Sequence, residues 1–197
     1  MQWTIRLVRT GDAAAIQFIY TPIVAETAVS FELEPPSVEV MRRRIETTLL
    51  TLPWLVCERD EVIGYAYAGV FRSRPAYQWT VEVTAYVHPA HRRKGVARAL
   101  YTSLFECLRV QGCRTALAVI ALPNPASVAL HERLGFRPIG VFHNVGYKLG
   151  AWHDVGWWEL ALQSPPDPPP QPQALPEVAS SDAWRAALAK GTGAVGS

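Results

Sequence analysis

The sequence predicts an α/β protein in which helices flank a mixed, mostly antiparallel sheet. Two observations favour this class: apolar residues recur at helical spacing in four separate stretches, and between these stretches the pattern changes to that of strands. A third is the order strand, helix, strand over residues 79–122, which is typical of a βαβ unit. With 197 residues, of which 49% are hydrophobic, the chain is long enough for one sizeable core and too short for two typical domains.

The first part of the chain is predicted to hold one strand and two helices. Residues 5–8 read as the strand, and Asp12 is placed to cap the helix that follows. Pro22 is expected to kink or end that helix because proline lacks a backbone donor. Ser37 is expected to cap a second helix, which extends to about Leu50.

The middle of the chain is predicted to form an antiparallel meander followed by the βαβ unit. The meander consists of strands over 54–58, 62–71 and 79–87, rich in Val, Tyr, Trp and Thr. A helix over 95–112 and a continuous apolar strand over 115–122 complete the βαβ unit.

The last ordered elements are predicted to be a short helix and further strands. Asn124 and Pro125 start the helix, and Gly135 is a natural residue to follow its end. The expected strands are 136–142, 147–149 and 155–162.

Composition changes after Gln163, where seven prolines lie between residues 165 and 176. Proline-rich segments do not form helices or paired strands easily. We therefore expect a globular domain over 1–163 and a disordered tail over 164–197. Residues 181–190 could form a short amphipathic helix with Trp184 and Leu188 on one side, but so short a helix is marginal alone, and a transient helix in a disordered end is favoured.

Charge and cysteine content exclude several classes of protein. A formal net charge of +2 gives no field strong enough for a dedicated nucleic-acid or membrane binder. The three cysteines are odd in number and lack CxxC spacing, and the histidines lack HExxH spacing, so neither a disulfide framework nor a metal site is expected. No export signal is evident, and a cytoplasmic location is expected.

Residues 85–100 carry the strongest chemical signal in the chain. A strand leads through the basic residues Arg92, Arg93 and Lys94 into a helix whose first amide groups can bind an anion. Gly95 allows close approach of a ligand to the backbone, although the pattern matches neither GxGxxG nor GxxxxGK[ST]. On this segment alone, a pyrophosphate site and a solvated basic turn are equally supported.

The segment resembles the acetyl-CoA-binding motif of the GNAT superfamily of N-acetyltransferases, and NPASVALHERLGF (124–136) is similar to the next motif of that superfamily. VSFELEPPS (29–37), AYQWTVE (76–82), YVHPAHRRKG (86–95) and WHDVGWW (152–158) resemble the phosphinothricin N-acetyltransferase group. The resemblance covers residues 4–162 and implies a GNAT-like fold, acetyl-CoA as co-substrate and a homodimer.

The resemblance also implies which residues bind acetyl-CoA. Three residues of the strand would pair with the pantetheine arm, and the basic loop with the first turn of the helix would hold the pyrophosphate. The implied cofactor-binding residues are Ala85, Tyr86, Val87, Arg92, Arg93, Lys94, Gly95, Val96, Ala97, Arg98 and Asn124.

Two side chains are candidates for proton transfer. Strand alternation places Glu82 with Thr84 and Tyr86 on one face, where burial beside a cleft would raise the pKa of the carboxyl and suit it as general base. The alternative is an exposed or salt-bridged strand carboxylate, and it is the match of the TVE motif (80–82) to the resembled group that implies the base role. His131 lies where the superfamily often has a tyrosine that protonates the leaving thiolate, and a buried structural histidine is the alternative. No GxSxG motif occurs, which is consistent with direct attack by the amine.

The candidate acceptor-binding residues are Phe31, Arg72, Arg74 and Tyr77, because arginine can hold a carboxylate and aromatic rings can wall a side chain. The predicted function is acetyl transfer to a small amino-acid-like amine such as phosphinothricin or methionine sulfoximine. Two alternatives stay open: a GNAT enzyme acting on a polyamine or a protein N-terminus, and a nucleic-acid-binding module that uses the basic loop.

Overall fold

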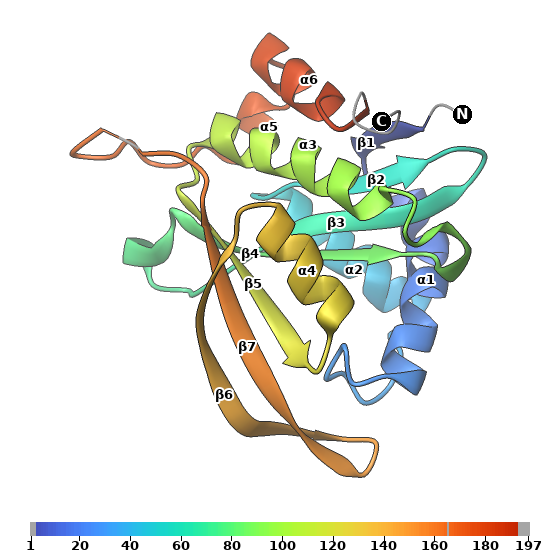
Figure 1. Ribbon diagram of the computed structural model, residues 1–197. Helices are drawn as coiled ribbons and strands as arrows, with labels where there is room; N and C mark the ends of the chain where they lie inside the picture. Colours follow the sequence, from blue (N-terminus) through green and yellow to red (C-terminus); the bar gives the residue numbers. More distant parts are fainter. Residues whose placement is uncertain (1–2, 165, 193–197) are drawn as a thin grey trace.

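The computed structural model describes residues 3–164 and 166–192 (Figure 1). Its strands form one sheet in the order β1-β2-β3-β4-β5-β7-β6. Within these residues β4 and β5 pair in parallel and the other neighbours are antiparallel, which confirms the predicted mixed sheet. The strands are β1 (Thr4–Leu7), β2 (Trp54–Glu58), β3 (Val62–Val70), β4 (Thr80–Val87), β5 (Thr115–Leu122), β6 (Arg137–Lys148) and β7 (Ala151–Ala161).

Helices cover both faces of the sheet. They are α1 (Ala13–Glu26), α2 (Val38–Leu49), α3 (Val96–Gln111), α4 (Pro125–Arg133), α5 (Leu175–Val178) and α6 (Asp182–Ala189). Figure 1 shows α3 in front of the sheet and α1 and α2 behind it. Each face therefore has its own core: Leu100 and Leu104 of α3 belong to one, and Ile16 of α1 and Ile45 of α2 to the other.

Strand β4 separates these two cores by simple alternation. Val81 and Val83 are buried on the α3 side, while Tyr86 packs against Tyr20 and Tyr65 on the α1 side. Since successive side chains of a strand point to opposite faces, Glu82 shares the α1 side with Tyr86, as the sequence predicts.

Local signals place most of the helix ends correctly. The Ser37 hydroxyl accepts a hydrogen bond from the Val40 amide at 3.2 Å, and Gly135 adopts φ +93° directly after α4. Asp12 does not cap α1, contrary to prediction: its carboxylate accepts from the Arg9 amide at 2.7 Å and from the guanidinium of Arg6. Both carboxylate oxygens of Asp12 accept hydrogen bonds from Arg6, so they do not bind the amide groups at the start of α1.

One of the two expected effects of Pro22 is not observed, and one strand boundary differs from the prediction. Pro22 does not end α1; the carbonyl that loses its partner belongs to Phe18, which is 66% exposed and leaves that group access to water. The separate strands expected at 136–142 and 147–149 form one strand, β6, because the ladder with β7 passes an irregularity between Phe142 and Gly146 and then continues.

The prediction of a disordered tail is wrong for residues 175–189. Helices α5 and α6 pack on α3 and β1 (Figure 1), where Leu175, Val178, Trp184 and Ala187 surround the fully buried Cys107. The Ser103 hydroxyl of α3 also donates to the Leu188 carbonyl at 2.7 Å. Such short helices are unstable alone, and it is tertiary burial of their apolar side chains that stabilises them.

Candidate active site

The site begins where the two parallel strands separate. β4 and β5 are paired over three positions, the last being Glu82 with Leu117. Beyond that point β4 stays paired with β3 as far as Val87 and β5 stays paired with β7 as far as Leu122. Among the described residues, the edge of β4 from Val83 onward therefore has no strand beside it, and Figure 1 shows β4 and β5 diverging. An extended ligand can pair with such an edge.

The loop from β4 to α3 is built to receive an anion. Gly95 has φ +85° and is the residue before α3, and a Cβ placed on it meets nothing within 4 Å. The first amide groups of a helix have no acceptor within the helix. The side chains of Arg92, Arg93, Lys94 and Arg98 are exposed around this helix end and form no ion pair within the described residues.

The predicted cofactor-binding residues divide into side-chain and backbone contributors. Val96 is buried in the α3 core with 1% exposure, so it can offer a ligand only its backbone. Ala85 and Val87 also pack on that core, and the Tyr86 ring lies on the opposite face. The small side chain of Ala97 leaves the first turn of α3 uncrowded. The strand residues can therefore contribute through their backbone edge.

Asn124 is the N-cap residue of α4. Its Oδ1 accepts a hydrogen bond from the Ser127 amide at 3.2 Å, which makes it the N-cap. The Nδ2 group is the part of this side chain that can donate to a ligand. The sequence predicted both the cap and a ligand contact, and the geometry is compatible with both.

Glu82 is half-buried at the point where β4 and β5 separate. Burial raises the pKa of its carboxyl above the usual glutamate value, and the positive charge of Arg72 opposes this shift. A carboxylate whose pKa lies closer to neutrality is a better proton acceptor at physiological pH. Glu82 is therefore a candidate for the general base, at the point where β4 and β5 separate.

His131 lies in the core between α4 and α3, with 5% exposure. Its Nδ1 is 2.8 Å from the Ser127 carbonyl oxygen, which can only accept, so Nδ1 carries the proton. Nε2, 3.1 Å from the Tyr101 hydroxyl, then accepts from that group. Burial lowers the pKa of His131, and both ring nitrogens are engaged. The geometry favours the structural alternative, and we propose that His131 positions α4 against α3.

This role predicts a loss of stability when His131 is replaced by Ala. The change leaves the Tyr101 hydroxyl without its partner and opens a cavity, so the free energy of unfolding should fall by about 2–4 kcal/mol. Because the folded-state pKa is lowered, wild-type stability should be complete above the unfolded histidine pKa and should decrease as pH falls below it. His131→Gln should lack that decrease.

Urea denaturation at pH 5 and pH 8 measures both effects, and exposed His143, replaced by Ala, is the control. A large loss of kcat in His131→Ala without any loss of stability would instead assign the residue to proton transfer.

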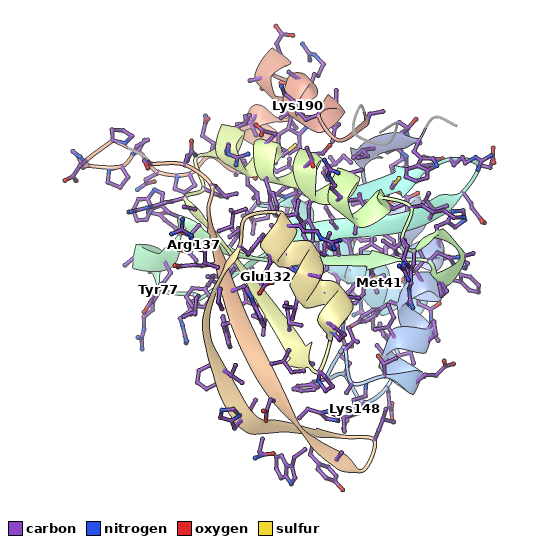
Figure 2. The ribbon with its side chains drawn as sticks, in the orientation of Figure 1. Met41, Tyr77, Glu132, Arg137, Lys148 and Lys190 are labelled. Atoms are coloured by element: carbon purple, nitrogen blue, oxygen red, sulfur yellow. The ribbon has the colours of Figure 1, made fainter. Side chains whose placement is uncertain are left out.

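The predicted acceptor residues occupy two different places. Arg72, Arg74 and Tyr77 lie on the segment from Phe71 to Trp79, here called the acceptor loop, and Figure 2 shows Tyr77 on it. Phe31 lies in the α1–α2 connection against Gly146 of β6, with its ring 6.1 Å from that of His153. The acceptor loop meets β7 at another position, since the Phe71 ring is 6.1 Å from that of Trp157. Both segments therefore pack on β7, Phe31 near His153 and the acceptor loop near Trp157.

Buried Lys148 fixes the position of the α1–α2 connection. Its ammonium donates to the carbonyls of Val24 and Ser30, at 2.6 and 2.7 Å. Figure 2 shows Lys148 where the β6–β7 hairpin meets that connection. Phe31, the next residue after Ser30, is thereby held on the hairpin.

Two cavities open on the β4 region. One of about 540 Å³ lies between α2 and strands β2–β4 and is rich in aromatic rings, and its nearest contact on β4 is Tyr86. The other, of about 260 Å³, includes Thr80 and Val81, the residues directly before Glu82, together with Arg72 and Arg74. The smaller cavity therefore adjoins β4 just before Glu82, whereas the larger one lies on the α1 side of β4, the face that Glu82 shares with Tyr86.

Sequence reasoning missed the residues that build the larger cavity. Tyr65 and Tyr67 of β3 share its wall with Tyr20, and Arg44 lies there in an ion pair with Glu32 at 2.7 Å. Alternation of tyrosine along β3 was the signal that could have placed two of these rings on one face. No local pattern joins them to Arg44, because α2 meets the sheet only in the folded chain.

Within residues 3–164 and 166–192, no group of three or more His, Cys, Asp or Glu side chains is arranged to hold a metal ion. The cysteines are free and buried, and burial raises the pKa of each thiol to about 12. None of the helices described is long and apolar enough to cross a membrane.

Comparison with known proteins agrees with this geometry. The model of the acetyltransferase (GNAT) domain matches residues 5–157. A phosphinothricin N-acetyltransferase of Streptomyces viridochromogenes is 41% identical over 84% of this chain and 91% of its own. An L-methionine sulfoximine/L-methionine sulfone acetyltransferase of Salmonella typhimurium is 37% identical over 81% of this chain and 94% of its own.

A solved structure has the same architecture. The GNAT superfamily phosphinothricin acetyltransferase of Sinorhizobium meliloti, in complex with AcCoA, superposes with a TM-score of 0.82 at 33% identity, covering 90% of this chain and 98% of its own. The divergence of β4 and β5, the glycine-led start of α3 and these matches lead to one conclusion: the chain belongs to the GNAT acetyltransferase family.

Proposed function

We propose that this protein transfers the acetyl group of acetyl-CoA to the amine of a small amino-acid-like acceptor, of the phosphinothricin or methionine sulfoximine type. One observation carries the proposal: a half-buried carboxylate, Glu82, lies where β4 and β5 diverge, between a free strand edge and an arginine-bearing loop. The acceptors named for the relatives from Streptomyces and Salmonella support this substrate class.

The residues present fit acetyl-CoA. The open space at Gly95, the amide groups at the start of α3 and the exposed Arg93 and Lys94 suit a pyrophosphate, and the free edge of β4 suits the pantetheine arm. When bound, acetyl-CoA supplies an activated thioester. The match to a relative crystallised with AcCoA supports the same co-substrate.

In this proposal Glu82 accepts a proton from the ammonium form of the acceptor, which generates the nucleophilic amine. The amine would then attack the acetyl carbon directly, so no enzyme nucleophile is needed. The C–S bond of the thioester would break, and the departing CoA thiolate would take up the proton that the acylated nitrogen loses. Two features of the site support this role: burial raises the pKa of Glu82, and Glu82 is the last residue of β4 that pairs with β5, directly before the free edge of β4. The positive charge of Arg72 favours the ionised form of Glu82 and lowers its pKa against the effect of burial.

Arg72 and Arg74 are proposed to hold the carboxylate of the acceptor. Neither forms an ion pair within the described part of the chain, whereas Arg44 of the larger cavity is paired with Glu32. No acidic residue lines the smaller cavity among the described side chains. A guanidinium can bind a carboxylate through two parallel hydrogen bonds, which would orient the amine toward Glu82.

An acceptor panel with thiol release as readout tests the proposal. Phosphinothricin and methionine sulfoximine should have higher kcat/KM values than spermidine or a peptide amine. Methionine sulfoximine without its carboxylate should react with a kcat/KM lower by about 10-fold or more, because charge-assisted hydrogen bonds are lost. Faster reaction of spermidine or the peptide would keep the family assignment and refute this acceptor class.

We further propose that the protein forms a homodimer through the β6–β7 hairpin. β6 is at the edge of the sheet, and large apolar side chains are exposed along it, including Phe142 at 57% and Tyr147 at 58%. Exposed apolar surface of this kind is typical of interfaces. Light scattering should report a dimer for the wild type and a monomer for Phe142→Glu with Tyr147→Glu; an unchanged mass would place the interface elsewhere.

A further inference from the structure

The C-terminal segment reaches the acceptor loop before it forms its helices. The indole Nε1 of Trp79, the last residue of that loop, donates to the Pro170 carbonyl at 2.7 Å. The backbone of Trp79 is held separately, because its carbonyl accepts from the amides of Arg114 and Thr115 at 2.8 and 3.2 Å. Trp79 is therefore attached to β5 through its backbone and to residue 170 through its side chain.

Three residues further on, the segment is bound firmly to α3. Gln111 and Gln173 exchange hydrogen bonds: the Gln173 amide donates to the Gln111 carbonyl at 2.8 Å, and the Gln111 Nε2 donates to the Gln173 carbonyl at 2.8 Å. The same Nε2 donates to the Thr51 carbonyl at 2.8 Å. Since Gln111 is 1% exposed, this connection is shielded from water, and residues 170–174 have a defined position beside the loop.

The acceptor loop and this segment enclose the 260 Å³ cavity together. Arg72, Arg74 and Gln78 line it from the loop, and Pro172 and Gln173 line it from the C-terminal segment. The matched GNAT domain ends at residue 157, so this wall comes from outside the domain. Arg72 and Arg74 lie on one side of the cavity. On the other side lie Pro172 and Gln173, and Gln173 is hydrogen-bonded to buried Gln111.

We propose that residues 170–174 are a positioning segment for the acceptor: they hold the acceptor loop through Trp79 and close the cavity that takes the carboxylate end of the amino-acid substrate. This rests on the proposed function, because it assumes that Arg72 and Arg74 bind that carboxylate. Without the hydrogen bond between the Trp79 indole and the Pro170 carbonyl, the acceptor loop should be more mobile. Arg72 and Arg74 would then be less well positioned before the substrate binds. The start of α3, where the pyrophosphate of acetyl-CoA is proposed to lie, follows the other end of β4, so the affinity for acetyl-CoA should be unaffected.

Trp79→Phe tests the role of the hydrogen bond to Pro170, because it removes the indole N–H and keeps an aromatic ring. The KM for methionine sulfoximine should rise by about 3- to 10-fold, the range of one net hydrogen bond. The KM for acetyl-CoA and the kcat should stay unchanged. Methionine sulfoximine that lacks its carboxylate should show no rise, since it makes no use of the arginines. A variant that merely lost folded protein would lower the apparent kcat and leave every KM alone.

Trp157→Phe is the matched control. Its Nε1 is buried with no hydrogen-bond partner among the described residues, and its ring lies beside Phe71 of the same loop. An equal rise of the acceptor KM in both variants would assign the effect to ring volume and overturn the inference. An unchanged acceptor KM in Trp79→Phe would overturn it as well. If the wild type acetylates no amino acid, the proposed function fails too, which the wild-type measurement alone reveals.

Discussion

Replacing Glu82 with Gln should lower kcat at neutral pH by about 10²-fold or more, while the affinity for acetyl-CoA stays nearly unchanged. The amide keeps the shape of the side chain but cannot accept a proton from the acceptor ammonium. Thiol release under saturating substrates measures the loss, and calorimetry with acetyl-CoA checks that the binding site is intact. Full activity in this variant would return Glu82 to a structural role.

The pH profile gives a second, independent signature of the same role. Because burial raises the pKa of Glu82, the wild-type kcat should decrease as pH falls through that raised value, and the Gln variant should lack this limb. Arg72 provides a matched perturbation: its charge lowers the pKa of Glu82, so Arg72→Gln should move the limb to higher pH. A limb that stays in place in Arg72→Gln would contradict the assignment.

Replacing Gly95 with Val should weaken acetyl-CoA binding by about 10- to 100-fold, the cost of losing one or two charge-assisted hydrogen bonds. The side chain would project into space that the protein leaves open at the start of α3, where the pyrophosphate is proposed to lie. The left-handed φ of +85° adds backbone strain for any residue with a Cβ. Titration calorimetry with acetyl-CoA measures the change in Kd.

Gly95→Ala separates the two causes of that loss. It carries the same backbone strain but a much smaller side chain, so its Kd should lie between those of the wild type and Gly95→Val. Circular dichroism should show that both variants retain their secondary structure, because no protein atom lies within 4 Å of the added Cβ. Equal affinity in the wild type and Gly95→Val would remove the loop from the acetyl-CoA site.

The sequence predicts the elements of this fold where local chemistry decides them. The helical spacing that ends at Leu49, the hydroxyl of Ser37 and the glycine after α4 each act within a few residues, so pattern and structure agree. Asp12 and Pro22 show the limit. An ion pair with Arg6 diverts the aspartate, and the exposure of Phe18 makes the proline tolerable. Both outcomes depend on which neighbouring groups a residue contacts in the folded chain, and the sequence pattern does not show this.

The C-terminal segment shows why composition can mislead. Its prolines exclude regular structure only over the residues that contain them, and the side chains of Trp184 and Ala187 find a buried surface on α3. An eight-residue helix is unstable in isolation, so its existence depends on a surface built by residues far away in sequence.

The sequence by itself determined the fold class, the position of the basic loop and the face of β4 that carries Glu82, because periodicity and helix-start chemistry are local. Only the tertiary structure decided that His131 is held between Ser127 and Tyr101, that Phe31 packs on the β6–β7 hairpin, and that Trp79 is hydrogen-bonded to Pro170. The physical reason is the same in each case: burial and hydrogen bonding join groups that are distant along the chain, and their geometry exists only once the sheet and its helices have packed.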